Sequence, residues 1–185
     1  MIKVQAVFFS LMIFVVGCGG PKQVNLTPGA PKKIVTPEWF ISPPKDGKFL
    51  YATVTETSRD MQMAISKSEA QARAELSRKM EAHGDALQKG FSQEIGDGGD
   101  STILKDFNET YKIVSSQIMV GTSTVERELV SQDGIYRAYV LMSLPLGKAN
   151  KQLLEQIRSQ NDLYTELRAT QAYKDLENEV AKLKD

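Results

Sequence analysis

Two side chains with distinctive chemistry each occur once in this 185-residue sequence, the thiol of Cys18 and the imidazole of His83. A histidine can act as a base or a metal ligand. His83, however, falls on an apolar helical stripe between Met80 and Leu87, where a packed ring with one hydrogen-bonded nitrogen is the more common role. One histidine and one cysteine do not supply the four ligands of the usual zinc site. The sequence also has no Gly-x-Ser-x-Gly motif for a nucleophilic serine.

Acidic residues near the middle of the chain are candidates for calcium binding. Asp97, Asp100 and Asp106 lie close to Gly98 and Gly99, but their spacing lacks the alternate oxygen ligands and the final glutamate of an EF-hand loop. We interpret this segment as a turn followed by a helix cap.

A second acidic group is formed by Glu69, Glu75 and Glu81, which are candidates for an acid–base pair. They alternate with Arg73 and Arg78, a pattern that is typical of a solvated helix face. The sequence therefore predicts a protein that is not an enzyme and that holds no metal or cofactor.

Composition narrows the class of protein further. Acidic and basic residues number 23 each, so the chain lacks the net basic charge that a nucleic-acid surface needs, and we expect no nucleic-acid partner. Hydrophobic residues make up 41% of the chain, which is enough for one domain of ordinary size with tails.

Cys18 follows a segment with the features of a secretory signal. Lys3 precedes an apolar run over 4–16, which suits the centre of a signal peptide and is shorter than the roughly 20 residues that span a bilayer. The residues Val15-Val16-Gly17-Cys18 resemble the bacterial lipobox, in which a small residue precedes an acylated cysteine. We expect a signal peptide over 1–17 and lipid attachment at Cys18. The alternative is an ordinary signal peptide or uncleaved anchor with an incidental cysteine, which would have no disulfide partner.

Residues 18–37 are expected to form the lipidated N-terminus and a flexible tether. These residues are rich in glycine, proline and lysine, and their apolar residues show no helical or strand spacing. The segment reaches on the order of 60 Å when fully extended. Gly19, where an aspartate would resemble an inner-membrane retention signal, indicates the outer membrane. Order should begin near Pro37-Glu38-Trp39-Phe40, and the β-branched and aromatic residues of 47–57 predict the first strand.

A long helix is predicted over 58–91, capped by Ser58 or Asp60. A small-residue patch of Ala64, Ser68 and Ala72 would allow this helix to lie close to a sheet. Gly84 costs the helix about 1 kcal/mol relative to alanine. The helical spacing is carried by Ile65, Ala72, Leu76, Met80, His83, Leu87 and Phe91.

The second half of the chain predicts a shorter helix to about Ser115 and then two strands within 116–144. Gln132-Asp133-Gly134 between them is a strong hairpin signal. Pro145 should end the last strand, and 147–160 should be helical.

The last segment, 159–185, predicts a charged C-terminal helix. This helix either folds back on its own domain or associates with a second copy, and the open strand edges offer another route to a homo-oligomer. Its apolar seam consists of Ala169, Tyr173, Leu176, Val180 and Leu183.

Several of these segments together resemble the LPP-twenty family of bacterial surface lipoproteins, which includes a flagellar lipoprotein that forms a disk around the motor. The resemblance covers roughly residues 38–158 and rests on the Pro-x-Trp entry, the Ala-rich "AISKSEAQARAELSRKM" and the strand "DGIYRAYVLMSLP". The segment "LYATVTE" lacks the glycines that relatives often place there. The resemblance implies an α+β fold of the SHS2 or dodecin-like kind, a long helix packed on a three-stranded antiparallel sheet, here with an added C-terminal helix.

These features predict a lipoprotein of the cell outer membrane, anchored through Cys18, whose domain faces the periplasm or the cell surface. We expect a structural or interaction role in the envelope, with envelope or flagellar proteins as candidate partners. The alternative is a periplasmic binding module for a small ligand or a cell-wall component. In that case aromatic rings would line a pocket between helix and sheet instead of filling the core: Trp39, Phe40, Phe49, Tyr51, Tyr136 and Tyr139.

Overall fold

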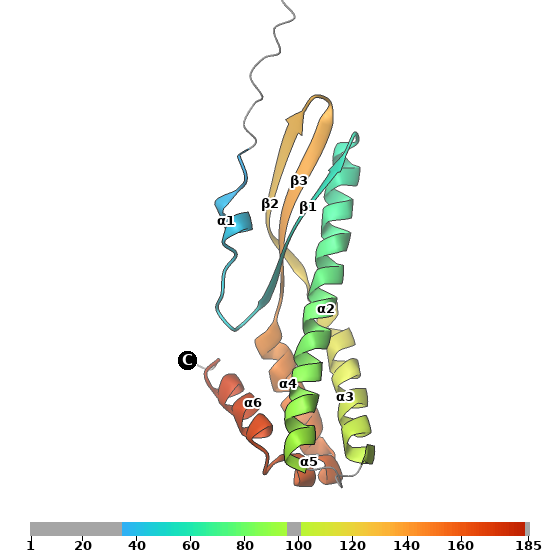
Figure 1. The fold of residues 1–185 in the computed structure, drawn as a ribbon, viewed down its shortest axis with the longest axis vertical. Helices are drawn as coiled ribbons and strands as arrows, with labels where there is room; N and C mark the ends of the chain where they lie inside the picture. The colour runs from blue at the N-terminus through green and yellow to red at the C-terminus, as the bar shows by residue number, and fades with distance from the viewer. Residues whose placement is uncertain (1–34, 96–100, 184–185) are drawn as a thin grey trace, which may run out of the picture. The chain divides into compact units, whose positions relative to one another are not determined.

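The computed structural model describes residues 35–95 and 101–183. Cys18, the signal segment, the tether up to residue 34 and residues 97–100 of the predicted calcium-type segment lie outside these ranges. The chain divides into two units, Met1–Lys33 and Ile34–Asp185, and every described residue belongs to the second. Its elements follow in the order α1 (Glu38–Ile41), β1 (Leu50–Ser58), α2 (Met61–Ile95), α3 (Ser101–Met119), β2 (Ser123–Gln132), β3 (Ile135–Leu144), α4 (Leu146–Ser159), α5 (Asn161–Leu167) and α6 (Gln171–Ala181) (Figure 1).

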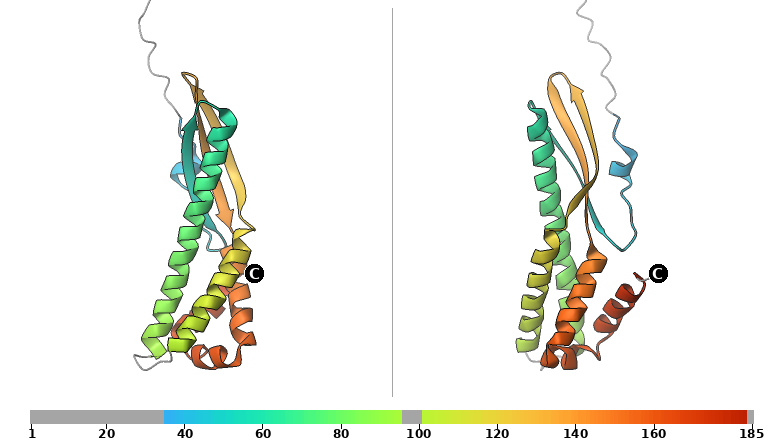
Figure 2. Two further views of the ribbon diagram at one scale, coloured as in Figure 1. Left: turned by 90° about the vertical axis from the view of Figure 1, so that its right-hand side faces the viewer. Right: turned by 180° about the vertical axis from the view of Figure 1, so that it is seen from behind.

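The sheet has three antiparallel strands in the order β1-β3-β2, and α2 packs along one of its faces. This confirms the predicted α+β architecture with the order strand, helix, strand, strand. The central strand β3 is buried from Ala138 to Leu144, because α2 covers one face and α1 lies on the other (Figures 1 and 2). On that second face the ring of Phe40 meets the ring of Tyr139 edge-on at 5.1 Å.

The first strand begins at Leu50, three residues later than 47, where the sequence predicts it. Asp46 explains the delay, because its carboxylate accepts hydrogen bonds from the backbone N–H groups of Lys48 (2.9 Å) and Phe49 (3.1 Å). This turn, with Gly47 at φ +68°, uses the residues that would otherwise extend the strand.

The small-residue patch of α2 lies directly against the sheet, as predicted. Ala64, Ser68 and Ala72 are each 0% exposed. The Ser68 hydroxyl accepts a hydrogen bond from Glu56 N–H (3.0 Å) and donates one to Ala138 C=O (3.0 Å). Glu56 and Ala138 are partners in the β1–β3 register, so this hydroxyl ties the helix to both strands at once.

Beyond the sheet, one side of the second half of α2 packs against helices α3 to α6 (Figures 1 and 2). They enclose apolar side chains that continue the core of the sheet without interruption, including Phe91, Phe107, Leu153 and Leu167. The 159–183 region therefore shares one core with the rest of the domain.

The prediction of a single C-terminal helix is wrong. The segment forms α5 and α6, separated at Arg168–Thr170, where Thr170 caps α6 by accepting a hydrogen bond from Tyr173 N–H (3.2 Å). Ala169 is exposed and does not belong to the seam. Tyr173, Leu176 and Val180 are buried within the domain, so the helix folds back on its own chain.

Glu94 at the end of α2 fixes the position of α6. Its carboxylate accepts hydrogen bonds from the N–H groups of Gln171 (2.7 and 2.9 Å) and Ala172 (3.2 Å). A negative charge at a helix N-terminus is stabilising because the first N–H groups have no partner within the helix. Gly90 allows the approach, since a Cβ there would lie 2.9 Å from Ala172 Cβ.

The Ser68 bridge predicts a measurable loss of stability on substitution. We expect Ser68→Ala to lower the free energy of unfolding by about 1–3 kcal/mol, because one buried and one partly buried backbone group lose a hydrogen-bond partner. Chemical denaturation measures the change. Ser66→Ala, on the exposed side of the same helix, is the matched control and should change it by less than about 0.5 kcal/mol. Equal effects of the two substitutions would contradict the bridge.

The predicted hairpin is confirmed, with a two-residue turn at Asp133 (φ +52°) and Gly134 (φ +75°). Positive φ at both central residues is the type I′ geometry. We expect Gly134→Val to destabilise the protein by at least about 1–2 kcal/mol, seen as a fall in melting temperature of about 2–8 °C. Asp133→Asn should leave the melting temperature nearly unchanged, because asparagine tolerates this conformation. A Gly134→Val protein with the melting temperature of the wild type would contradict a requirement for glycine at this turn position.

Candidate functional site

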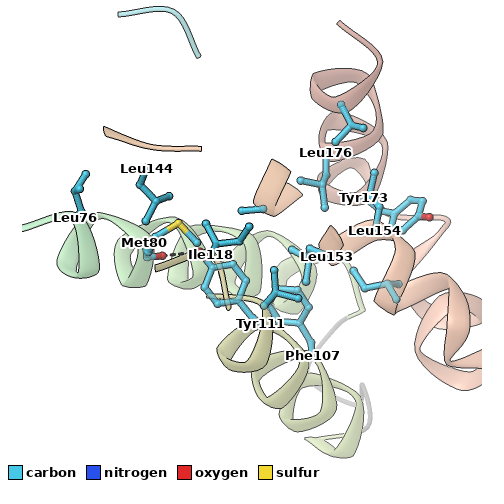
Figure 3. Packing of buried hydrophobic residues seen from close by; sticks show 14 of the residues in the cluster. Leu76, Met80, Phe107, Tyr111, Ile118, Leu144, Leu153, Leu154, Tyr173 and Leu176 are labelled. Atoms are coloured by element: carbon cyan, nitrogen blue, oxygen red, sulfur yellow. Dashed lines mark hydrogen bonds between the residues drawn. The ribbon is translucent and has the colours of Figure 1, made fainter. Parts of the chain in front are cut away.

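The two longest helices, α2 and α3, cross at Gly84 and Tyr111. A Cβ at position 84 would overlap the Tyr111 ring, so glycine is required for this close approach. The Tyr111 hydroxyl donates a hydrogen bond to the Met80 carbonyl (2.6 Å), which is drawn in Figure 3. Burial raises the pKa of the Tyr111 phenol to about 12, so this donor keeps its proton at physiological pH.

Beside this crossing, an open groove of about 270 Å³ runs along α2 and α3. Its floor is apolar and is formed by Met80, Gly84, Tyr111 and Met119. Figure 3 shows Met80 of α2 and Tyr111 of α3 lying side by side at this crossing. Ligand sites are commonly concave, mainly apolar and bounded by a few polar groups, and this groove has that character.

The polar part of the groove includes the neutral side chains of Ser77, Asn108, Ser115 and Ser116, and its rim also carries charge. Glu81 and Asp85 stand on the α2 side and Lys112 on the α3 side, and all three are exposed. Within residues 35–95 and 101–183, neither carboxylate forms an ion pair. The charge of Asp85 contributes to the raised pKa of Tyr111, so its negative charge acts on the Tyr111 hydroxyl at the floor of the groove.

His83 lies outside the groove, in a polar network that joins three helices. Its Nε2 lies 3.0 Å from Asn150 Oδ1, and the Asn150 amide N–H donates to Glu179 Oε2 at 3.0 Å. Because the Asn150 nitrogen donates to Glu179, its oxygen faces His83 and Nε2 is the donor. This is the packed, hydrogen-bonded role expected for the residue.

The candidate acid–base residues of α2 are not brought together. Glu69 pairs with Arg127 (3.4 Å) and Arg73 (3.8 Å), and Glu75 pairs with Arg78. Glu81 alone reaches the groove. In the part of the chain that the structure describes, no group of three or more His, Cys, Asp or Glu side chains is placed to hold a metal ion.

The six aromatic residues proposed from the sequence as a pocket lining are not gathered at this groove. The Trp39 ring packs against the Phe40 ring, which in turn packs against the Tyr139 ring. The ring centroids of Phe49 and Tyr51 lie 6.0 Å apart. None of the six lines the groove. Two signals in the sequence pointed toward the groove without identifying it, a glycine inside a long helix and two acidic residues four positions apart.

The raised pKa of Tyr111 predicts a specific loss of stability at high pH. The folded state holds the phenol proton to about pH 12, against an ordinary value of 10.0. The contribution is therefore complete below pH 10 and is lost as pH rises toward 12. We expect a fall of about 2–3 kcal/mol in the free energy of unfolding over this window, measured by denaturant titration. In Tyr111→Phe the free energy of unfolding should fall less over this window. The control, Tyr136→Phe, should show the same fall as the wild type. Equal slopes in wild type and Tyr111→Phe would contradict the assignment.

No protein-family model matches the chain, and no curated protein matches it either.

Proposed function

We propose that this protein is a lipoprotein of the cell outer membrane with a structural or interaction role in the envelope. The observation that carries the proposal is the sequence Val15-Val16-Gly17-Cys18-Gly19 directly after an apolar run. Acylation of Cys18 would attach the chain to the membrane, since each buried acyl methylene contributes about 0.8 kcal/mol and several chains make the attachment stable. Residues 19–37 would then act as the tether.

The described domain supports this proposal as a self-contained folded module. Its core is continuous from the sheet to α6, so the apolar side chains of the C-terminal helices are buried within the domain itself. Across residues 35–95 and 101–183, no helix is both long and apolar enough to cross a membrane.

The two edges of the sheet indicate which surfaces of the domain are open to association with other proteins. At the β1 edge, Lys79 Nζ donates to Tyr51 C=O (2.6 Å) and Gly147 N–H donates to Lys48 C=O (3.0 Å). The β2 edge carries an irregularity at Thr124/Glu126 and a run of exposed charges over 126–128. Charged and bulged edges oppose strand addition. Self-association or binding of envelope or flagellar proteins would then use helical surfaces.

A second candidate function, a periplasmic binding module, is favoured by the α2–α3 groove. The groove and the expected anchor involve different residues, so the two functions do not exclude each other.

Membrane attachment is tested at Cys18. We expect Cys18→Ser to move the protein from the membrane fraction to the soluble fraction of a bacterial host and to abolish labelling by palmitate. Gly17→Leu should block processing, because the small residue before the cysteine is lost, and Gly17→Ala is the matched control that should be processed normally. Separation of the two membranes by density should place the wild type in the outer one. A Cys18→Ser protein that still carries acyl chains would refute the proposal.

A further inference from the structure

We propose that the groove between α2 and α3 binds an organic cation with an apolar body, such as an alkyl or aryl ammonium compound. The inference rests on the second candidate function, that of a binding module, and it gives the class of ligand. It does not depend on the lipid anchor.

The floor of the groove supplies the apolar half of this recognition. Met80 and Tyr111 are almost fully buried, at 2% and 8% exposed, and Met119 is partly exposed at the open side. Methionine thioethers are flexible and polarizable, so they adapt to ligands of different shape. The groove has a volume of about 270 Å³, about nine times the roughly 30 Å³ that one water molecule occupies. This volume suits an alkyl or phenyl group.

The rim supplies the charged half. Glu81 and Asp85 are four residues apart on α2, so they stand on the same side of the helix, where like charges repel. Lys112 provides one positive charge against their two negative ones, and it forms no ion pair with either among the described residues. A bound cation relieves the repulsion, whereas an anion of the same shape adds to it.

The geometry also sets the orientation of the ligand. The ammonium group lies at the α2 rim, within reach of Glu81 and Asp85 and away from Lys112. The apolar body lies over the floor toward Met80 and Met119. Both the charge and the apolar body are therefore required, and a small ammonium ion without the body has nothing to place on the floor.

The test uses the full chain with Cys18→Ser, so that binding and anchoring are measured independently. Benzyltrimethylammonium is the probe, with benzenesulfonate, benzyl alcohol and tetramethylammonium as comparisons. Binding is followed by the methyl resonances of Met80 and Met119, which line the groove. We expect saturable shifts with benzyltrimethylammonium, weaker ones with benzyl alcohol, and none with the other two probes.

The charge requirement is tested with Glu81→Gln/Asp85→Asn. We expect this pair to weaken binding of benzyltrimethylammonium about fivefold, since each exposed charge pair contributes modestly. Asp162→Asn/Glu166→Gln is the matched control, because these exposed residues of α5 have the same spacing and charge. Thermal unfolding confirms that both variants fold. Absent shifts at Met80 and Met119, equal binding of the sulfonate, or equal weakening by the control pair would overturn the proposal, and none of these results would affect the assignment of Cys18.

Discussion

Close contact between α2 and the sheet is the constraint on which the rest of this domain depends. A helix usually keeps its distance from a sheet because side chains fill the space between them. Here Ala64, Ser68 and Ala72 remove that bulk. The Ser68 hydroxyl then connects backbone groups of β1 and β3 that are partners in the register. The position of the helix and the register of the strands are thus determined together, by one fully buried side chain that both accepts and donates a hydrogen bond.

The length of α2 determines what the other helices do. Its 35 residues extend about 50 Å, whereas a strand of 10 residues such as β3 extends about 34 Å. The part of α2 beyond the sheet would expose apolar residues such as Phe91 if it stood alone. Helices α3 to α6 cover it, and Gly84 and Gly90 let two of them approach closely. The groove and its charged rim are products of this second packing, not of the sheet.

The elements that follow from local signals could be predicted from the sequence. Alternating residues and Asp133-Gly134 specify the hairpin, and the spacing of Leu76, Met80 and Phe91 specifies the buried side of α2. The break at Arg168–Thr170 could not be predicted, because the apolar spacing runs through it without a glycine or proline. The groove could not be predicted either, since the sequence alone does not tell which side of α3 faces α2.

The continuity of α2 has a consequence for cooperativity. A helix shared by two parts of one core links their unfolding, because neither part keeps its packing surface when the helix frays in the other. Backbone amides near the middle of α2, between Leu76 and Gly84, should exchange with solvent only through global opening of the domain. The ends of the helix are free to open locally. Slow amide exchange would therefore be concentrated at the junction between sheet and helices. If α2 were interrupted there, the same junction would be a hinge.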